Sequence, residues 1–216
     1  MAYIEHFGET RKGEGRALSE EPRIHPSSRI SKCELGAYTS IGGNCSMRES
    51  SMGDYSYLAG DVSIVWTDIG KFCSIASHTR MNPGNHPTWR VTTSHSTYRR
   101  VQYGFDETDD EEFFAWRQAH RCRVGHDVWM GHGTLLTAGC KVGIGVCTGS
   151  GSVITKDIPP YAIVGGVPAK VIKFRFDPKT IEKLMRIAYW EWDHETVKAR
   201  FKDLYNVNEF VEKYEV

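Results

Sequence analysis

Apolar residues recur along this chain at steps of five or six residues, and the steps repeat in groups of three. The first block of such positions comprises Ile24, Ile30, Leu35, Ile41, Met47, Met52, Leu58, Ile64, Ile69, Ile75 and Met81. Three successive steps add to 17 residues, so each position has an equivalent 17 residues later. Neither an α-helix nor a long two-sided strand keeps this period, whereas a coil with three short flat sides does. The pattern therefore predicts a parallel β-solenoid whose apolar side chains point to its axis.

The repeat resumes in a second block further along the chain, where every step is six residues. Its positions are Val124, Met130, Leu136, Val142, Thr148 and Ile154. Thr148 is polar where an aliphatic residue is expected; its β-branched shape suits a strand, and its hydroxyl needs a backbone partner if it is buried. We predict one solenoid domain over residues 22–176, interrupted at residues 82–121 by an insertion rich in aromatic residues.

The insertion itself carries a helix signal. Thr108–Glu111 matches the capping-box pattern, so we expect a helix that continues to about Ala119. The acidic residues 106–112 are then the solvated start of this helix, where negative charge is favourable. Four arginines of the insertion are available to hold an anionic group, although the neighbouring acids are equally able to neutralise them: Arg90, Arg99, Arg100 and Arg117.

The two ends of the chain do not follow the repeat. Residues 1–21 are polar and without period, and we expect them to be an N-terminal lead-in. Asp177 followed by Pro178 predicts the cap and first residue of a helix, and Asp193 is positioned to cap a second one. We predict that residues 177–216 form a helical cap over the open end of the solenoid, which would otherwise expose a sheet edge.

The charge balance and cysteine pattern narrow the class of function. Lys and Arg together number 27, as do Asp and Glu, so no electrostatic footprint indicates nucleic acid or an anionic membrane. The sequence shows neither a signal peptide nor an apolar stretch long enough to span a membrane, and we expect a cytoplasmic location. The six cysteines include no CxxC pair and are expected to be structural thiols.

Three glycine-rich segments then carry a family resemblance: residues 125–133 (GHDVWMGHG), 149–160 (GSGSVITKDIPP) and 165–173 (GGVPAKVIK). The chain resembles the hexapeptide-repeat acyltransferases over nearly its whole length. These segments are similar to the coenzyme A side of the xenobiotic acetyltransferases of the chloramphenicol type and of the galactoside acetyltransferases. Including residues 82–89 and the Trp-Glu-Trp of the tail, the chain looks closest to the hexapeptide transferases associated with phosphonate metabolism. The resemblance implies a mainly β fold, a left-handed parallel β-helix, assembled as a homotrimer.

The resemblance also assigns a general base. His86 lies at the start of the insertion, between Asn85 and Pro87, and a His in such a loop is the base in the resembling enzymes. Acetyl transfer needs a general base. A side chain that titrates near neutrality can take the proton of the alcohol or ammonium as that group attacks the thioester. The alternative is that His86 only fills a turn. The sequence assigns no orienting group; a backbone carbonyl would serve as well as a carboxylate.

In the galactoside acetyltransferases, the residues that match several positions of this chain contact coenzyme A. They imply roles for Ser150, Thr155, Lys156 and Lys173, and Lys170 is a further candidate for a phosphate. His132 matches a family Ser that also contacts the coenzyme, and this replacement leaves that contact open. The alternative for each lysine is that it lies at the end of a strand, exposed to solvent, and binds no coenzyme.

Together these observations predict an acetyl-CoA-dependent O- or N-acetyltransferase that needs no metal. Its acceptor would be a small hydroxyl- or amine-bearing molecule, such as an antibiotic or a phosphonate-related metabolite, bound between subunits. A nucleotide-sugar acyltransferase is a variant within the same class. A different class is a non-catalytic trimeric scaffold. A third is a metal hydratase like the γ-class carbonic anhydrases, but His126 and His132 are six residues apart where that site needs five, which moves the second His to the next side of the coil.

Overall fold

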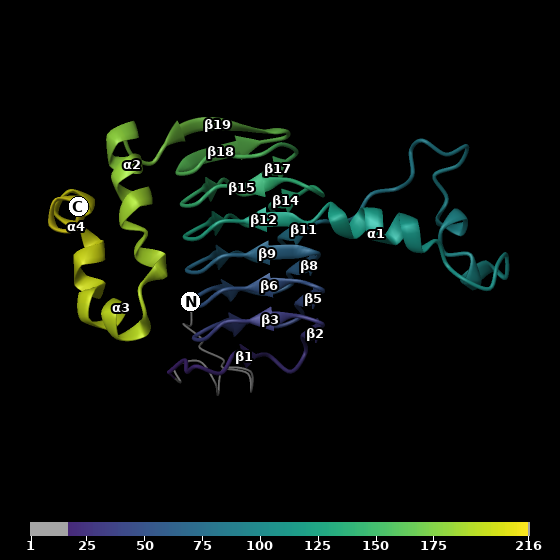
Figure 1. Ribbon diagram of the computed structural model, residues 1–216, viewed down its shortest axis with the longest axis horizontal. Coiled ribbons are helices and arrows are strands. Elements are labelled where there is room, and N and C mark those ends of the chain that lie inside the picture. Colours follow the sequence, from purple (N-terminus) through teal and green to yellow (C-terminus); the bar gives the residue numbers. More distant parts are fainter. Residues whose placement is uncertain (1–16, 216) are drawn as a thin grey trace, which may run out of the picture.

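The computed structural model describes residues 17–215 of the chain. Within this range the backbone winds through three parallel β-sheets in turn, and the stacked coils form a three-sided column (Figure 1). We call the sheets A, B and C, and the three edges of the column A/B, B/C and C/A after the sheets that meet there. The 17-residue repeat is confirmed by the sheet register, since Ile41 pairs with Leu58 and Leu58 with Ile75.

Sheet A has eight strands. In spatial order they are β1 (Arg23–Ile24), β4 (Ser40–Ile41), β7 (Tyr57–Leu58), β10 (Ser74–Ile75), β13 (Trp129–Met130), β16 (Cys147–Thr148), β18 (Ala162–Gly166) and β19 (Ala169–Phe174). All neighbouring strands are parallel except the last pair, because β19 returns along β18 as a hairpin. This hairpin ends the column at its C-terminal end (Figure 1).

Sheets B and C complete the column. Sheet B contains β2 (Arg29–Ser31), β5 (Ser46–Arg48), β8 (Ser63–Val65), β11 (Arg80–Met81), β14 (Leu135–Leu136) and β17 (Val153–Ile154). Sheet C contains β3 (Glu34–Leu35), β6 (Ser51–Met52), β9 (Thr67–Ile69), β12 (Cys122–Val124) and β15 (Lys141–Val142). The coils continue in register across the insertion, because Ile75 of β10 pairs directly with Met130 of β13.

The predicted inward positions form the core of the column. Ile64, Ile75, Met130 and Leu136 are fully buried, and each is covered by its equivalents in the coils on either side. Thr148 is also buried, and its hydroxyl accepts a hydrogen bond from the backbone amide of Gly131 at 3.0 Å, as the sequence predicted. A side chain at Gly131 would lie 2.5 Å from the Thr148 carbonyl, so only glycine permits this close stacking of coils.

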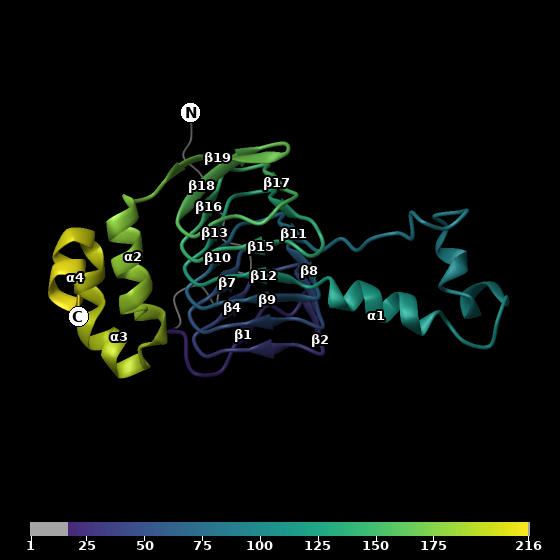
Figure 2. The ribbon, with the colours of Figure 1, turned by 45° about the horizontal axis from the view of Figure 1, so that its top comes forward.

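Residues 82–121 leave the column at the B/C edge as an arm that extends far beyond the coils (Figures 1 and 2). The arm contains the short 3-10 helices η2 (His95–Thr97) and η3 (Val101–Tyr103) and the helix α1 (Glu111–Ala119). The predicted helix is present and ends at Ala119, but its cap is Asp110 rather than Thr108. The Asp110 carboxylate accepts from the Phe113 amide at 3.0 Å and thereby satisfies a free amide of the first turn.

The C-terminal part forms helices as predicted, with Asp177 and Asp193 as caps. The elements are α2 (Pro178–Ile187), η4 (Tyr189–Glu191), α3 (His194–Arg200), η5 (Phe201–Tyr205) and α4 (Val207–Tyr214). Their predicted position is wrong: they lie along the C/A edge of the column and not across its open end (Figures 1 and 2).

An aromatic stripe on the C/A edge explains this position. Tyr38, Tyr55 and Phe72 are 17 residues apart and stack on one another, with ring centroids 5.3 and 4.6 Å apart. His194 of α3 stacks on Tyr38 at 4.2 Å, and its Nδ1 lies 2.8 Å from the Tyr55 hydroxyl. The helices therefore partly cover a stripe of aromatic side chains that repeats from coil to coil. No helix within residues 17–215 is long and apolar enough to cross a membrane.

Candidate active site

His86 is exposed at the start of the arm and is held by the backbone of the same segment. Its Nδ1 lies 2.8 Å from the carbonyl oxygen of Thr93, and the Tyr98 hydroxyl lies 3.5 Å from the same nitrogen. A carbonyl only accepts hydrogen bonds, so Nδ1 carries the proton. In the neutral ring the lone pair is therefore on Nε2, which makes no hydrogen bond within the described part of the chain. This is the tautomer that a general base needs, and the orienting group is a backbone carbonyl.

The loop around His86 is fixed by an aromatic cluster. Tyr98 is buried and packs on Phe113 of α1 at 4.3 Å between ring centroids, while its ring edge faces His86 at 6.0 Å. Pro87 is buried beside them. The imidazole thus lies on a packed platform although its own ring faces solvent.

The residues expected to hold coenzyme A are divided between two edges of the column and the terminal strand. His132 and Ser150 occupy equivalent positions of successive turns on the A/B edge, where the Gly151 amide donates to the His132 carbonyl at 2.7 Å. Lys170 pairs with Gly165 at the same edge, one turn further along. All three side chains are exposed. The structure thus aligns His132, Ser150 and Lys170 along one edge.

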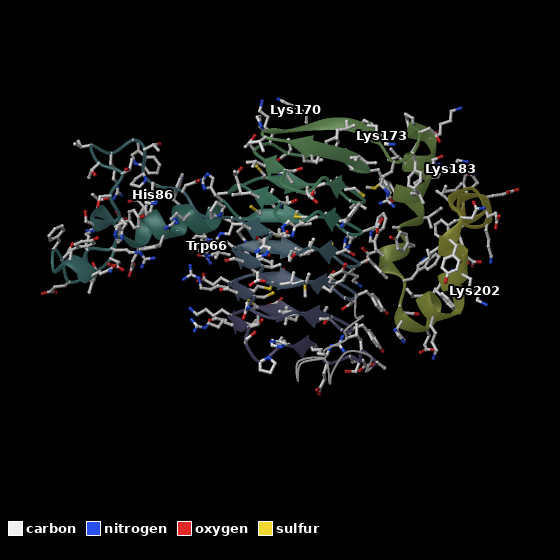
Figure 3. The ribbon with its side chains drawn as sticks, turned by 180° about the vertical axis from the view of Figure 1, so that it is seen from behind. Trp66, His86, Lys170, Lys173, Lys183 and Lys202 are labelled. Atoms are coloured by element: carbon white, nitrogen blue, oxygen red, sulfur yellow. The ribbon has the colours of Figure 1, made fainter. Side chains whose placement is uncertain are left out.

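Thr155, Lys156 and Lys173 lie elsewhere. Thr155 and Lys156 follow β17 at the B/C edge, the edge from which the arm departs. Lys173 pairs with Ile163 at the far end of β19, toward the C-terminal helices. Figure 3 shows Lys170 and Lys173 on the last strand of the column, whereas His86 lies out on the arm beyond Trp66. One chain therefore does not bring all the expected coenzyme residues to His86.

His132 contacts two side chains of the preceding coil. Its Nδ1 lies 2.9 Å from the Ser77 hydroxyl in the turn of the preceding coil. Its ring meets His78 edge to face at 5.0 Å. The imidazole therefore occupies the surface of the A/B edge where a Ser would leave space.

The arginines of the arm fall into two pairs. Arg90 is neutralised by Asp110 at 2.7 Å, and Arg100 by Asp106 at 2.9 Å and by Asp110 at 3.3 Å. Arg99 and Arg117 form no ion pair among residues 17–215. The acids of the arm thus neutralise only one of these pairs.

His126 and His132 lie on different edges of the column, as their spacing predicted. His126 is at the C/A edge, where its Nδ1 accepts from the Lys71 amide at 3.0 Å and its ring stacks on Trp190 at 5.6 Å. Burial lowers its pKa, the nearby Glu191 partly opposes this, and Lys71 adds to it. Within the described residues, no three His, Cys, Asp or Glu side chains are grouped as a metal site requires.

Curated relatives extend the similarity beyond the fold. The chain is 37% identical over 144 residues to a chloramphenicol acetyltransferase of Klebsiella aerogenes, covering 65% of this chain and 66% of that protein. It is 36% identical over 146 residues to the Morganella morganii chloramphenicol acetyltransferase, covering 66% of this chain and 67% of the relative. A probable macrolide acetyltransferase of Lysinibacillus sphaericus is 33% identical over 132 residues, 60% of this chain and 71% of that one. The chain thus spans about two thirds of the length of these relatives. It belongs to their family, the hexapeptide-repeat acetyltransferases. No protein-family model matches it.

Solved structures at lower identity share the fold. The N-acyltransferase AntD from Bacillus cereus, in complex with dTDP and 3-hydroxybutyryl-CoA, is 16% identical with a TM-score of 0.56, covering 83% of this chain and 88% of that one. PerB from Caulobacter crescentus, in complex with CoA and GDP-perosamine, is 19% identical with a TM-score of 0.53, covering 74% of this chain and 59% of that one.

Two features of the site were not predicted from the sequence. The Thr93 carbonyl was not identified as the partner of His86, because a backbone contact seven residues away leaves no side-chain signal. Arg48 and Arg80, which face the root of the arm, were also missed. Each directly flanks an inward position of the repeat, Met47 or Met81, so the repeat itself contained a signal that both point outward.

Proposed function

We propose that this protein is an acetyl-CoA-dependent O- or N-acetyltransferase in which His86 is the general base. The acceptor is a small molecule with a hydroxyl or amine, an antibiotic or a phosphonate-related metabolite. Membership of the acetyltransferase family supports the reaction class, and the free Nε2 of an imidazole fixed at Nδ1 supports the role of His86. The left-handed sense of the coil and a cytoplasmic location, both expected from the sequence, belong to the same proposal.

The reaction needs only one proton acceptor. As the acceptor oxygen or nitrogen attacks the acetyl carbonyl carbon, its proton passes to Nε2 of His86. The C–S bond of the thioester then breaks, and the departing thiolate takes a proton back from the imidazolium. The Thr93 carbonyl stabilises the imidazolium through Nδ1–H throughout. No covalent enzyme intermediate is required.

The observation that supports an active site shared between subunits is the separation of His86 from the residues expected to bind the coenzyme (Figure 3). The arm projects away from its own column, and several large side chains on it are exposed, including Trp89 at 60% and Phe105 at 70%. A homotrimer explains both facts if each arm reaches the column of a neighbour. The active site then contains His86 of one protomer and Ser150, Thr155, Lys156, Lys170 or Lys173 of another.

Mixed trimers test this arrangement. His86→Ala alone should reduce turnover by roughly a hundredfold or more, with coenzyme binding intact. A second variant, Ser150→Trp, should block the coenzyme groove while leaving the arm unchanged. If sites are shared, an equimolar mixture refolded together regains roughly a quarter of the wild-type activity, since the two functional halves meet by chance. If both halves come from one chain, the mixture stays inactive and the interface proposal is wrong. Near wild-type turnover by His86→Ala would exclude the base.

A further inference from the structure

A cleft of about 600 Å³ lies between the root of the arm and the outer face of sheet B. Four arginines line it. The column contributes Arg48 from β5 and Arg80 from β11, and the arm contributes Arg99 and Arg117. Trp66, at the root of the arm in Figure 3, forms part of its wall. The cleft is thus bounded by two walls that each carry two guanidinium groups.

Little within the described chain neutralises these arginines. The guanidinium of Arg117 lies 5.6 Å from the Trp66 ring and 5.8 Å from the Tyr98 ring, and its buried Nε has no hydrogen-bond partner. Arg99 lies over Phe114 at 5.3 Å. Arg80 donates to the Ser63 hydroxyl, a neutral group. Arg80, Arg99 and Arg117 therefore contact aromatic rings or a hydroxyl group and no carboxylate within the described chain.

Two acids also line the cleft, and neither balances it. Glu49 accepts from the Trp66 indole N–H at 3.0 Å and lies 3.8 Å from Nε of Arg48. Glu111, in the first turn of α1, forms no ion pair within residues 17–215. Four cations and two carboxylates leave an excess of two positive charges in a partly buried site. Unlike Arg90 and Arg100, the cleft arginines are thus held together without enough internal counter-charge.

The mutual repulsion has a cost that a bound anion would remove. Burial lowers the pKa of Arg80, and the nearby Arg48 lowers it further. Burial also lowers the pKa of Arg117; Tyr98 opposes this, while Arg99 and Arg48 add to it. Guanidinium groups bind oxyanions through paired N–H donors, and arginines on two walls can surround a tetrahedral group.

We propose that this cleft binds a dianionic tetrahedral group, such as a phosphate, that belongs to the acceptor. Two negative charges match the excess of two positive charges. The cleft and the proposed base also share one segment of chain, because Pro83 and Gly84 line the cleft and precede His86 by three and two residues. The lysines expected to hold the coenzyme are in the last coils, whereas Arg48 and Arg80 are in earlier ones. The assignment to the acceptor rests on the proposed function; the anion site itself does not.

Inorganic phosphate is the probe for a calorimetric test. It is titrated into the whole 216-residue chain, with and without saturating coenzyme A, and acetate at equal ionic strength serves as the monoanionic comparison. We expect saturable phosphate binding that persists with coenzyme A bound, and weaker binding of acetate. Arg48→Gln, Arg99→Gln and Arg117→Gln should each weaken phosphate binding by roughly tenfold. Arg29→Gln is the matched control, since Arg29 is exposed on β2 of the same sheet but outside the cleft. The Arg117 side chain packs on aromatic rings, so its variant can misfold. The Arg48 and Arg99 variants keep the test valid in that case.

Each other outcome overturns the proposal in a recognisable way. Absence of phosphate binding, in protein that binds acetyl-CoA, excludes the anion site and leaves the acetyltransferase function intact. Equal binding by the cleft variants and the control places the phosphate elsewhere. Competition between phosphate and coenzyme A, with weaker coenzyme binding in the cleft variants, assigns the cleft to the coenzyme. Loss of the oligomer in the arginine variants, measured by light scattering, assigns it to a carboxylate of a second copy. Phosphate binding in protein that does not bind acetyl-CoA would retain the anion site but reject its assignment to an acetyltransferase acceptor.

Discussion

The column and the arm are stabilised in different ways. In the column, each coil supplies short strands and buried aliphatic residues, and the next coil repeats them in register. In the arm, the fold is held by an aromatic cluster around Tyr98 and Phe113 and by ion pairs to Asp110, while Trp89, Val91 and Phe105 face solvent. The aliphatic core of the column is thus complete within one chain, although Tyr57 and Trp129 are exposed on the outer face of sheet A. The arm has no such continuous core and exposes apolar surface that a second copy would cover. Stability and the candidate chemistry are therefore separated in this molecule: the repeat provides the scaffold, and the break in the repeat carries His86.

The largest expected effect is on the column. Ile64 is fully buried on β8, so Ile64→Ala should lower the free energy of unfolding by about 2–5 kcal/mol through lost contacts and a cavity. Thermal or urea unfolding measures this change. Activity per folded molecule should stay near wild type, because Ile64 does not contact the arm cluster. Ile172→Ala is the matched control, since Ile172 is 68% exposed, and its stability should be nearly unchanged. Equal losses in both variants would contradict the repeat-based core.

A smaller effect is expected within the arm. Asp110 caps α1 and pairs with Arg90 and Arg100. Burial alone would raise its pKa, but the Phe113 amide and Arg90 hold that pKa below its usual value. Asp110→Ala should therefore destabilise the arm locally by about 0.5–2 kcal/mol, the range for a lost helix cap. Faster amide exchange in α1, with unchanged exchange in the column, is the expected result.

The control for Asp110 is Glu112→Ala, in the same first turn of α1 but exposed. Turnover should fall in the Asp110 variant and stay near wild type in the Glu112 variant, because the ordered arm positions His86. A cooperative loss of protection in the column and the arm together would show that the two regions do not unfold separately.

A further expected effect concerns association. Phe105 is 70% exposed on the arm. If a second copy covers it, Phe105→Ser should weaken the trimer by about 1–2 kcal/mol, as truncation of an interface aromatic does, and leave the unfolding of the column unchanged. Sedimentation at several protein concentrations measures this. Tyr205→Ser is the control, because Tyr205 is 78% exposed on the C-terminal helices. Dissociation of the Tyr205 variant alone would show that subunits meet through the C-terminal helices and not through the arm.

The smallest expected effect is a pH dependence of thermal stability, which comes from His126 where the C-terminal helices meet the column. Burial lowers the pKa of His126, so its folded-state pKa is below the unfolded value of about 6.5. The contribution of neutral His126 is then fully present above that value and is lost as the pH falls below it. We expect thermal stability to decline from pH 7 to pH 5 and to decline less in His126→Asn, whose amide oxygen can accept from the Lys71 amide. His25→Asn should behave like wild type; an unchanged slope in His126→Asn would exclude the linkage.

Much of the fold was predictable because a solenoid is periodic. The inward positions, the insertion at residues 82–121 and the caps Asp177 and Asp193 all follow from residue type and spacing. The sequence also contained the signal for the position of the C-terminal helices, since Tyr38, Tyr55 and Phe72 share the 17-residue period. The prediction of a helical cap at the open end is nevertheless wrong, because the β18–β19 hairpin ends the column there.

The sequence by itself determined the repeat, and hence which side chains of the column are buried, because each coil meets its neighbour through local register. It also gave His86 as the candidate base, through the resemblance of its Asn-His-Pro loop to a loop of the acetyltransferases. Only the tertiary structure decided which groups His86 and the arginines face. The Thr93 carbonyl orients His86 through a loop closure, and Arg48 and Arg80 share a cleft with Arg99 and Arg117 at the root of the arm. At least one partner in each of these contacts belongs to the arm, which lies outside the period, so the spacing of the repeat does not predict the contact.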